Sequence, residues 1–364
     1  IPSGLSTLVA GIGWFAVNTI SGTFALQALF GGLNVFAALA IIILLQVGVA
    51  FVGHNLIQKW ERYASFFLAA VWLVVVVTVF TMPGVFDVAL PTGDFPWAGF
   101  TLTAGAAYGY TAGWTAFASD YTRYLPANTN KRALGWAAGL GNFVSTTLIM
   151  VVGAVAFNTI APGSDFWGVE NPTKAFTLLF QPSFAALVLL GIVIGSVSAN
   201  ILNVYSGAMS FLAMGFKLGF KSRRAIMVAL AGLVGGLISY LGVVNGDVAH
   251  QLDSFLLVVS YWVAPWIAVV LTERLLSRGK NAGERALAPK NSWAGAAAFV
   301  IATAFSIWGF CSQVLYTGPI AIAIHHVTLP NGAIVDVPDI TALVGFALAS
   351  LLFVVFRSAD KNSK

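Results

Sequence analysis

Long runs of apolar residues, separated by short polar segments, recur along the whole chain and most constrain its fold. The sequence is 59% hydrophobic and only 9% charged, whereas soluble domains carry about a quarter charged residues. A helix needs about 20 apolar residues to cross a bilayer. Ten segments meet this requirement, near residues 6–29, 35–52, 63–82, 98–118, 134–160, 185–211, 225–244, 255–271, 293–315 and 341–356. We therefore expect an all-α integral membrane protein embedded in the lipid bilayer.

The charged residues between these spans alternate from one side of the membrane to the other. All but one of the 18 lysines and arginines fall in every second loop or in the C-terminal tail, and Lys174 is the exception. Cytoplasmic loops of membrane proteins are enriched in lysine and arginine. We therefore expect a multi-pass protein of the cell (plasma or inner) membrane, with both ends of this chain cytoplasmic. Because the basic residues are spread over short loops, the net charge of +5 does not indicate a nucleic-acid partner.

Other classes of function find little support in the sequence. No nucleophile–base pattern, zinc-protease motif or phosphate-binding loop is present, so we do not expect an enzyme. No acidic or basic residue lies at the centre of a span, as a buried proton relay or a channel's charged ring would require. The adjacent His325 and His326 lack further ligands at suitable spacing for a metal, and the single Cys311 is interpreted as a small core residue.

The first span carries an aromatic residue and an amide on one helix face. Trp14 and Asn18 are four residues apart and therefore neighbours on a helix. A ring beside an amide can stack on a planar ligand and bond its edge. Packing of the tryptophan, with the asparagine bonded to a neighbouring helix, would explain the pair equally well.

The fourth span combines regularly spaced glycines with aromatic and hydroxyl residues. Gly105, Gly109 and Gly113 repeat every four residues, which permits close helix packing. Tyr110 and Trp114 share another face. A locally unwound helix that lines a cavity would be an alternative explanation. Asp120 and Arg123 follow at the cytoplasmic end, as a structural ion pair or as a gate.

The sixth span is the most polar segment of the chain. Asn200 and Asn203 are three residues apart and share a face, with Ser196 and Ser206 on the same stripe and Ser198 off it. Amides are costly in hydrocarbon unless they find partners. We therefore interpret this face as lining a ligand cavity, in preference to holding another helix.

Four segments resemble a known family of transporters. Residues 119–126, Ser-Asp-Tyr-Thr-Arg-Tyr-Leu-Pro, resemble the sequence that follows the sixth helix of the nucleobase–cation symporter-1 family, in its purine/cytosine permease branch. Residues 13–18 are similar to that family's third helix, 199–206 to its eighth, and 260–266 to its tenth. The segments occur in the family's order along the whole chain.

The resemblance implies a LeuT-like fold, built from a five-plus-five inverted repeat with two additional helices. The ten spans would be helices three to twelve, and we expect the N-terminal two helices to be missing from this sequence. Residues 1–364 would then form a single transporter domain. In it, residues 1–97 complete the first repeat, 98–275 form the second repeat, and 292–364 add the two extra helices.

The resemblance also implies site residues. Trp14 would stack on the nucleobase, and Asn18 would lie beside it. Asn203 would bond the ring edge, with Asn200 as a second amide. A further stacking position of the family falls on Thr111, where many members carry an aromatic residue. This departure leaves Tyr110 or Trp114 to take its place.

The coupling ion is less clearly implied. The family's sodium site uses hydroxyl residues of the eighth helix, and Ser198 fits one such position. The preceding residue is Val197, which has no oxygen to offer. Sodium (Na+) therefore remains one possible coupling ion and a proton (H+) the other, and no other cofactor is expected.

These features together predict a secondary active symporter that imports a nucleobase, such as cytosine or a purine, with a cation. A transporter of the same fold for allantoin, hydantoin, thiamine or an amino acid is the closest alternative. A passive channel and a membrane enzyme are the remaining ones.

Overall fold

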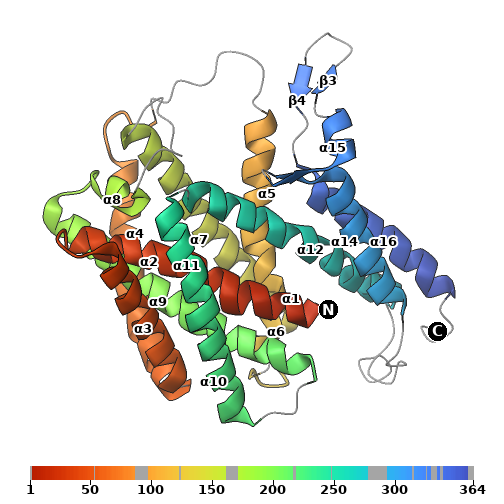
Figure 1. Ribbon diagram of the computed structural model, residues 1–364, viewed down its shortest axis with the longest axis horizontal. Coiled ribbons are helices and arrows are strands. Elements are labelled where there is room, and N and C mark those ends of the chain that lie inside the picture. Colours follow the sequence, from red (N-terminus) through yellow and green to blue (C-terminus); the bar gives the residue numbers. More distant parts are fainter. Residues whose placement is uncertain are drawn as a thin grey trace. The chain divides into compact units, whose positions relative to one another are not determined.

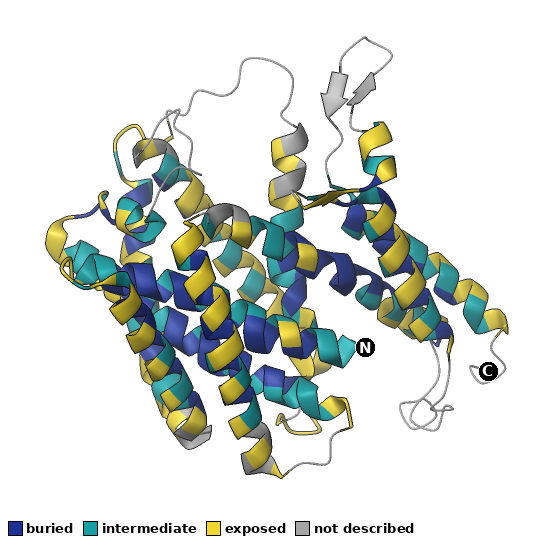
Figure 2. Cartoon of the chain, viewed as in Figure 1, coloured by how far each residue is buried: buried dark blue, intermediate teal, exposed yellow. Residues whose placement is uncertain are grey.

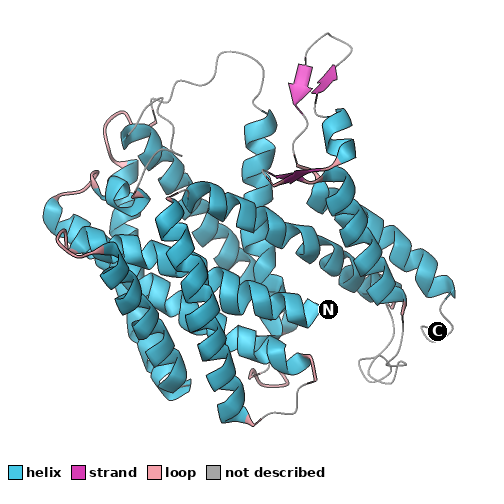
Figure 3. Cartoon of the chain, in the orientation of Figure 1, coloured by secondary structure: helices cyan, strands magenta, loops and turns pink. Residues whose placement is uncertain are grey.

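A computed structural model shows that helices make up most of the chain and that two short β-hairpins lie among them (Figures 1 and 3). The structure describes residues 2–52, 54–86, 97–122, 124–160, 171–215, 219–246, 248–277, 293–313, 315–324, 326–328, 334–336 and 339–359. Two compact units are present: residues 1–90 with 119–252, and residues 91–118 with 253–364.

The first unit is helical over most of its described residues. Its elements are α1 (Pro2–Leu8), η1 (Val9–Trp14), α2 (Phe15–Leu29), α3 (Val35–Val52), α4 (His54–Phe80), α6 (Ala118–Thr122), α7 (Lys131–Ile160), α8 (Pro172–Thr177), α9 (Pro182–Ala213), α10 (Phe220–Leu230), η4 (Ala231–Gly235) and α11 (Gly236–Asn245). Both η1 and η4 are π-helical turns within longer helices. Such turns are rare and often occur at functional sites.

Helix α9 is the central element of this unit and packs against α1, η1, α2, α3, α4, α8 and α10 (Figure 1). Apolar side chains fill its interfaces. Leu189 and Val193 pack with residues of α2 and α3, whereas Val188 packs with valines of α4 and α7. The polar stripe of α9 is therefore enclosed by helices on several sides.

Two glycines allow the N-terminal helix to approach α9 closely. A Cβ atom added to Gly207 would lie 2.9 Å from the Cα atom of Gly11, and one added to Gly11 would lie 2.5 Å from Cε of Met227. Small residues at such crossings let two backbones pack in direct contact. Gly11 lies within η1, so the close crossing coincides with the π-helical turn.

The second unit contains the fourth predicted span and the C-terminal part of the chain. Its elements are α5 (Trp97–Gly113), the 3₁₀ turn η2 (Trp114–Phe117), most of α12 (Val248–Leu276), α14 (Ala294–Phe310), β1 (Ser312–Gln313), β2 (Tyr316–Thr317), α15 (Pro319–Ile324), β3 (His326–Thr328), β4 (Ile334–Asp336) and α16 (Thr341–Ala359). Strands β1 and β2 pair antiparallel, as do β3 and β4.

Small residues also bring the helices of this unit together. Ala268, Ala302 and Ala349 on α12, α14 and α16 are fully buried against one another. On α5, a Cβ atom at Gly109 would lie 2.0 Å from the Leu256 carbonyl oxygen of α12. The prediction that glycines of the fourth span serve close packing is thereby confirmed. The helix tightens to 3₁₀ geometry only after Gly113.

Polar contacts connect α12 to the two ends of α16. Near the start of α16, the Tyr261 hydroxyl in the middle of α12 donates a hydrogen bond to Asp339, whose carboxylate also accepts from the Ser312 amide at 2.9 Å. Near the end of α16, Arg357 forms an ion pair with Glu273 at 3.1 Å. The apolar interface between α12 and α16 thus lies between two polar contacts.

The membrane prediction agrees with seven described helices that are long and apolar enough to cross a bilayer. These are residues 2–29, 59–80, 131–157, 182–213, 225–245, 251–276 and 341–359, and shorter apolar helices cover 35–51 and 294–310. Large apolar side chains are exposed along many of them. Figure 2 shows such a helix in α3, which has buried residues on one side and exposed residues on the other. The count of ten spans stays a prediction.

The predicted span 293–315 was wrong at its C-terminal end. Helix α14 ends at Phe310, and Cys311 adopts an extended conformation. The Gly318 amide donates to the Cys311 carbonyl at 2.7 Å, which closes the β1–β2 hairpin. A Cβ atom at Gly318 would lie 2.5 Å from the backbone of Gly309. The chain therefore turns back against the helix end.

We predict that the Gly109→Ala substitution destabilises the protein, because its methyl group would overlap the Leu256 carbonyl oxygen. Overpacking of this kind costs about 1–3 kcal/mol. Thermal unfolding in detergent should show a lower Tm. Gly139→Ala on α7 is the matched control, since no atom lies within 4 Å of its added Cβ. Equal Tm values for the two variants would contradict the close α5–α12 contact.

Candidate functional site

The buried amide of Asn200 uses all its hydrogen-bonding groups within the protein. Its Nδ2 donates to the Phe15 carbonyl at 2.9 Å and to the Thr19 hydroxyl at 3.2 Å. Its Oδ1 accepts from Nδ2 of Asn18 and from Nδ2 of Asn203, each at 3.1 Å. A side-chain amide has two donors and can accept two bonds. Asn200 therefore joins α9 to α2, which is the helix-holding role that the sequence analysis ranked second.

Asn18 and Asn203 lie side by side because both donate to the same oxygen of Asn200. The second N–H of Asn18 is bonded to the Trp14 carbonyl at 2.9 Å. Three polar groups of this pair make no further hydrogen bond to the described residues: Oδ1 of Asn18, Oδ1 of Asn203 and the second N–H of Asn203. None of them is among the fully buried polar atoms that lack a partner. These groups are two acceptors and one donor that a ligand could use.

Trp14 stands at the junction between the π-helical turn η1 and α2. Here side-chain amides satisfy two backbone carbonyls: Asn18 bonds that of Trp14, and Asn200 that of Phe15. Trp14, Asn18 and Ser21 are half-buried, whereas Phe15 and Thr19 are fully buried. The helix face that carries Trp14 and Asn18 is thus more accessible than the face that carries Phe15 and Thr19.

Two further members of this polar network were missed in the sequence analysis. The Thr19 hydroxyl lies 2.8 Å from Oε1 of Gln46, and Nε2 of Gln46 donates to the Ser196 carbonyl at 3.4 Å. Both side chains are fully buried. Gln46 is the sole polar residue of 35–52, and this isolation is the signal that could have identified it.

Ser198 faces α4, away from the amide stripe. Its hydroxyl accepts a hydrogen bond from the Trp60 indole at 2.8 Å, and the Glu61 carboxylate lies nearby. Val197 packs in an apolar cluster with Val49 and Trp60. Glu61 was missed because the predicted span began at residue 63, whereas α4 begins at His54. The Ser198 position therefore offers two side-chain oxygens, one of them from a carboxylate.

The remaining predicted binding residues belong to the second unit. Tyr110 and Thr111 lie on α5, and Trp114 begins η2. The Thr111 hydroxyl donates within its own helix, to the Ala107 carbonyl at 2.9 Å. The structure thus gives Thr111 a local hydrogen bond, and a shared site with Trp14 stays a prediction.

Several secondary predictions fall on residues that the structure describes only in part. Arg123 lies outside the described residues, as do His325 and the side chain of His326. Asp120 is buried, so its predicted pairing with Arg123 stays a prediction. Cys311 is a buried free thiol, as expected for a core residue. The described residues contain no group of three or more His, Cys, Asp or Glu side chains that could hold a metal.

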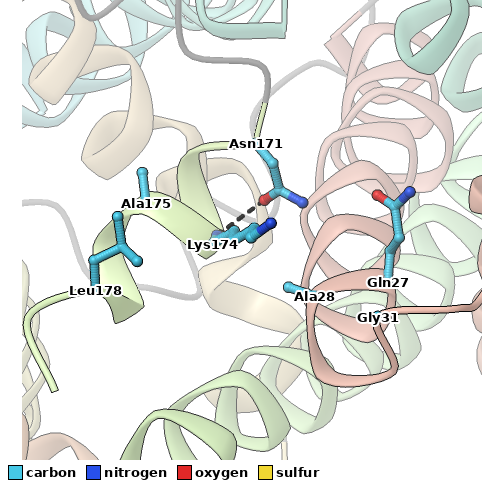
Figure 4. A pocket seen from close by; sticks show the side chains of 7 residues that line it. All are labelled: Gln27, Ala28, Gly31, Asn171, Lys174, Ala175 and Leu178. Carbon is cyan, nitrogen blue, oxygen red and sulfur yellow. Dashed lines mark hydrogen bonds between the residues drawn. The ribbon is translucent and has the colours of Figure 1, made fainter. Parts of the chain in front are cut away.

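A separate cavity of about 490 Å³ lies between the end of α2 and the short helix α8 (Figure 4). It is lined by Gln27, Ala28, Gly31, Asn171, Lys174, Ala175 and Leu178. The side-chain Oδ1 of Asn171 accepts from the backbone N–H of Lys174 at 2.9 Å, and Nδ2 of Asn171 donates to the Phe24 backbone carbonyl at 3.2 Å. None of the predicted binding residues lines this cavity, so we do not assign it to the amide site.

Comparisons with known proteins identify the family of this chain. A family profile described as "Permease for cytosine/purines, uracil, thiamine, allantoin" matches residues 1–330. The Bacillus subtilis protein YxlA is 26% identical over 94% of this chain and 73% of its own length. Purine-cytosine permease fcyB of Emericella nidulans is 27% identical over 96% of this chain and 68% of its own length.

A solved structure has the same fold. It is that of Mhp1, a nucleobase-cation-symport-1 family transporter in a closed conformation with bromovinylhydantoin bound. The TM-score is 0.63 at 18% identity, over 99% of this chain and 75% of that chain. The similarity supports a membrane-transporter fold.

We predict that Asn200→Ala lowers the stability of the protein. Four hydrogen bonds are lost, three of them to α2, and interhelical bonds in membranes contribute about 0.6–2 kcal/mol each, so we expect a loss of about 2–6 kcal/mol. The measurement is reversible unfolding in mixed micelles. Asn142→Ala on α7 is the control, because the side-chain oxygen of Asn142 accepts a local bond from the Thr146 hydroxyl, one turn away on the same helix. Equal stability of the two variants would contradict the proposed link between α2 and α9.

Proposed function

This chain belongs to the family of permeases for cytosine/purines, uracil, thiamine and allantoin, and from this membership we propose that it is a secondary active symporter. Membership establishes a multi-pass membrane transporter rather than an enzyme. The proposed substrate is a nucleobase such as cytosine or a purine, imported with a cation across the cell membrane. The alternation of basic loops favours cytoplasmic positions for both ends of this chain.

The observation that carries the substrate proposal is the pair of partly satisfied amides, Asn18 and Asn203. They offer two acceptors and one donor on adjacent side chains. The edge of a nucleobase alternates donors and acceptors in the same way, and asparagine pairs with two neighbouring groups of adenine in DNA recognition. The indole of Trp14 lies one helical turn from Asn18 and would stack on the flat ring.

Transport itself would follow the alternating-access scheme of inverted-repeat transporters, in which one bundle rocks against the other around a central site. The fold similarity supports a five-plus-five repeat for this chain. Tyr110, Thr111 and Trp114 are further substrate-binding residues in this proposal. These assignments belong to the proposal.

The coupling cation would bind near Ser198, where the Glu61 carboxylate adds a second side-chain oxygen. Sodium prefers several oxygen ligands, and Val197 supplies none from its apolar cluster. A proton needs only one titratable group. Both cations remain part of the proposal.

A transporter of the same fold for another heterocycle is the alternative substrate proposal. Allantoin and thiamine are named in the family description, and the hydantoin derivative is bound by Mhp1. Competition between radiolabelled cytosine and unlabelled purines, uracil, allantoin, hydantoin and thiamine would separate these possibilities.

We predict that Asn203→Ala reduces the kcat/KM of cytosine uptake by about tenfold or more, because unpaired polar groups in a binding site cost about 1–3 kcal/mol each. The Tm should stay close to that of the parent protein, since Oδ1 of Asn200 keeps its bond from Asn18. Uptake and membrane level are measured together. Normal affinity and rate in this variant would remove Asn203 from the substrate site.

We also predict that accumulation of the base depends on a cation gradient. Uptake into cells should collapse with a protonophore if the proton is the coupling ion, or on replacement of sodium by choline if sodium is. Reconstituted vesicles with defined gradients provide the control for secondary effects on metabolism. Accumulation no higher than the external concentration under every gradient would indicate a passive channel.

A further inference from the structure

We propose that the cavity between the end of α2 and α8 is an outer binding site, where a carbonyl-bearing nitrogen heterocycle docks before it reaches the amide site. The proposal rests on the proposed function, because its ligand is the transported base. It adds a second site to that function and assigns Lys174 as the residue that captures the ligand there.

The cavity has the size and lining of a small-molecule site. Its volume of about 490 Å³ falls within the range of about 300–1,000 Å³ that is common for ligand pockets. The apolar or small lining residues are Ala28, Gly31, Ala175 and Leu178, and the polar ones are Gln27, Asn171 and Lys174 (Figure 4). A flat ring can rest on such aliphatic side chains while the polar groups bind its edge.

Asn171 contributes a hydrogen-bond donor of fixed direction. Its Oδ1 accepts from the backbone N–H of Lys174 at 2.9 Å and from the Thr173 hydroxyl at 2.6 Å, which uses both acceptor positions of the amide oxygen. One N–H of Nδ2 bonds the Phe24 carbonyl of α2 at 3.2 Å. The second N–H of Asn171 is therefore the group left for a ligand.

Lys174 and Gln27 bring the other polar groups to the cavity. Among the described residues, the ammonium of Lys174 and the side-chain amide of Gln27 have no hydrogen bond or ion pair. Figure 4 shows the Lys174 side chain directed from α8 toward α2. None of the seven lining residues is acidic. The cavity thus offers mainly donors, so a ligand must bring acceptors.

The charges of the neighbouring segments favour a neutral ligand over an anion. The alternation of basic loops places the end of α2 and α8 on the same, outer side of the membrane. Lys174 is the sole basic residue of the predicted outer segments. These segments carry eight carboxylates, at Asp87, Asp94, Asp165, Glu170, Asp247, Asp253, Asp336 and Asp339. Their combined field repels anions. The carbonyl oxygen and ring nitrogen of a base such as cytosine supply acceptors without a negative charge.

The cavity and the amide site are separate stations along one helix. Ala28 is ten residues from Asn18, which corresponds to about 15 Å along α2. Ala25 lies between them and is fully buried in a cluster with Ala38 of α3 and Leu189 of α9. A ligand in the cavity therefore does not contact the amides, and the two sites are occupied one after the other.

The test is the protection of a cysteine placed in the cavity, in whole protein on intact cells. Leu178→Cys is combined with Cys311→Ser, which removes the single native cysteine. Leu178 is 72% exposed, so its replacement should be tolerated. The rate of labelling by a membrane-impermeant maleimide is measured with and without cytosine. Leu315→Cys is the matched control, because Leu315 is 98% exposed and lies in the β1–β2 hairpin.

We expect the maleimide to react from outside and cytosine to slow its reaction at Leu178→Cys at least threefold, with no effect at Leu315→Cys. Addition of Lys174→Met should abolish this protection. Addition of Asn203→Ala should retain it, because the outer site binds the base by itself. Lys131→Met, at the start of α7, removes a positive charge elsewhere and should also retain it.

Radiolabelled uptake provides a second readout. Lys174→Met should raise the KM for cytosine about threefold, since contacts of exposed charged groups are weak, and should leave kcat unchanged. Lys174→Arg keeps the positive charge and should restore most of the affinity. A fall in kcat or in membrane level at constant KM would show a purely structural role for Lys174 and overturn its assignment.

Other results would overturn the outer site itself. Labelling of Leu178→Cys only after permeabilisation would put the cavity on the cytoplasmic side. Protection by acetate or phosphate, and not by cytosine, would make it an anion site. Equal protection of Leu315→Cys would indicate a general conformational change. Normal cytosine uptake without protection would contradict this inference alone, whereas protection without uptake of any base would remove the proposed transport function and leave the outer site standing.

Discussion

The four hydrogen bonds of the Asn200 amide are the interaction on which the candidate site depends. In a membrane interior no water is at hand to satisfy a polar group, so each one needs a partner from the chain. Asn200 meets this need by bonding α2 at two points and by accepting from two neighbouring amides. The side chains with remaining capacity, Asn18 and Asn203, are those that a substrate could use. Stability and recognition are therefore assigned to different members of one network.

Hydrogen bonds of this length require the helices to lie close together, and small residues make that possible. Gly11 and Gly207 bring η1 against α9, and Gly22 accommodates Ser196 where α2 passes the same helix. The π-helical turn η1 ends at Trp14, next to the two carbonyls that accept side-chain bonds. Close packing, an irregular turn and the polar network thus occur at one place in the first unit.

Much of this could be predicted because the relevant signals are local in the sequence. Apolar run length located the long apolar helices, and the i,i+3 and i,i+4 spacings placed Asn200 with Asn203 and Trp14 with Asn18. The family resemblance is confirmed by the family match. The partner of a buried amide on another helix is not a local property, so the roles of Thr19 and Gln46 emerged only from the structure. Cavity lining was preferred for Asn200, yet its four protein bonds give it a structural role.

Other differences have equally physical reasons. Hydropathy places a span at its apolar centre, so Glu61 was excluded from a helix that extends beyond the hydrophobic run. The end of α14 depends on a hairpin closed by Gly318 and by the Asp339 carboxylate, both distant in sequence from the helix. The grouping of Tyr110 and Trp114 with Trp14 depends on the placement of two units, which no residue pattern within either unit determines.

The contact between Gly11 and Gly207 has a mechanical consequence. Most helix pairs interlock through side chains that occupy fixed holes in the partner, so rotation of one helix disengages several contacts at once. Here two bare stretches of backbone meet, with the flexible end of Met227 as their nearest side chain. Such a crossing offers few side chains to disengage, so at this point it resists rotation of one helix against the other less than an interlocked pair would.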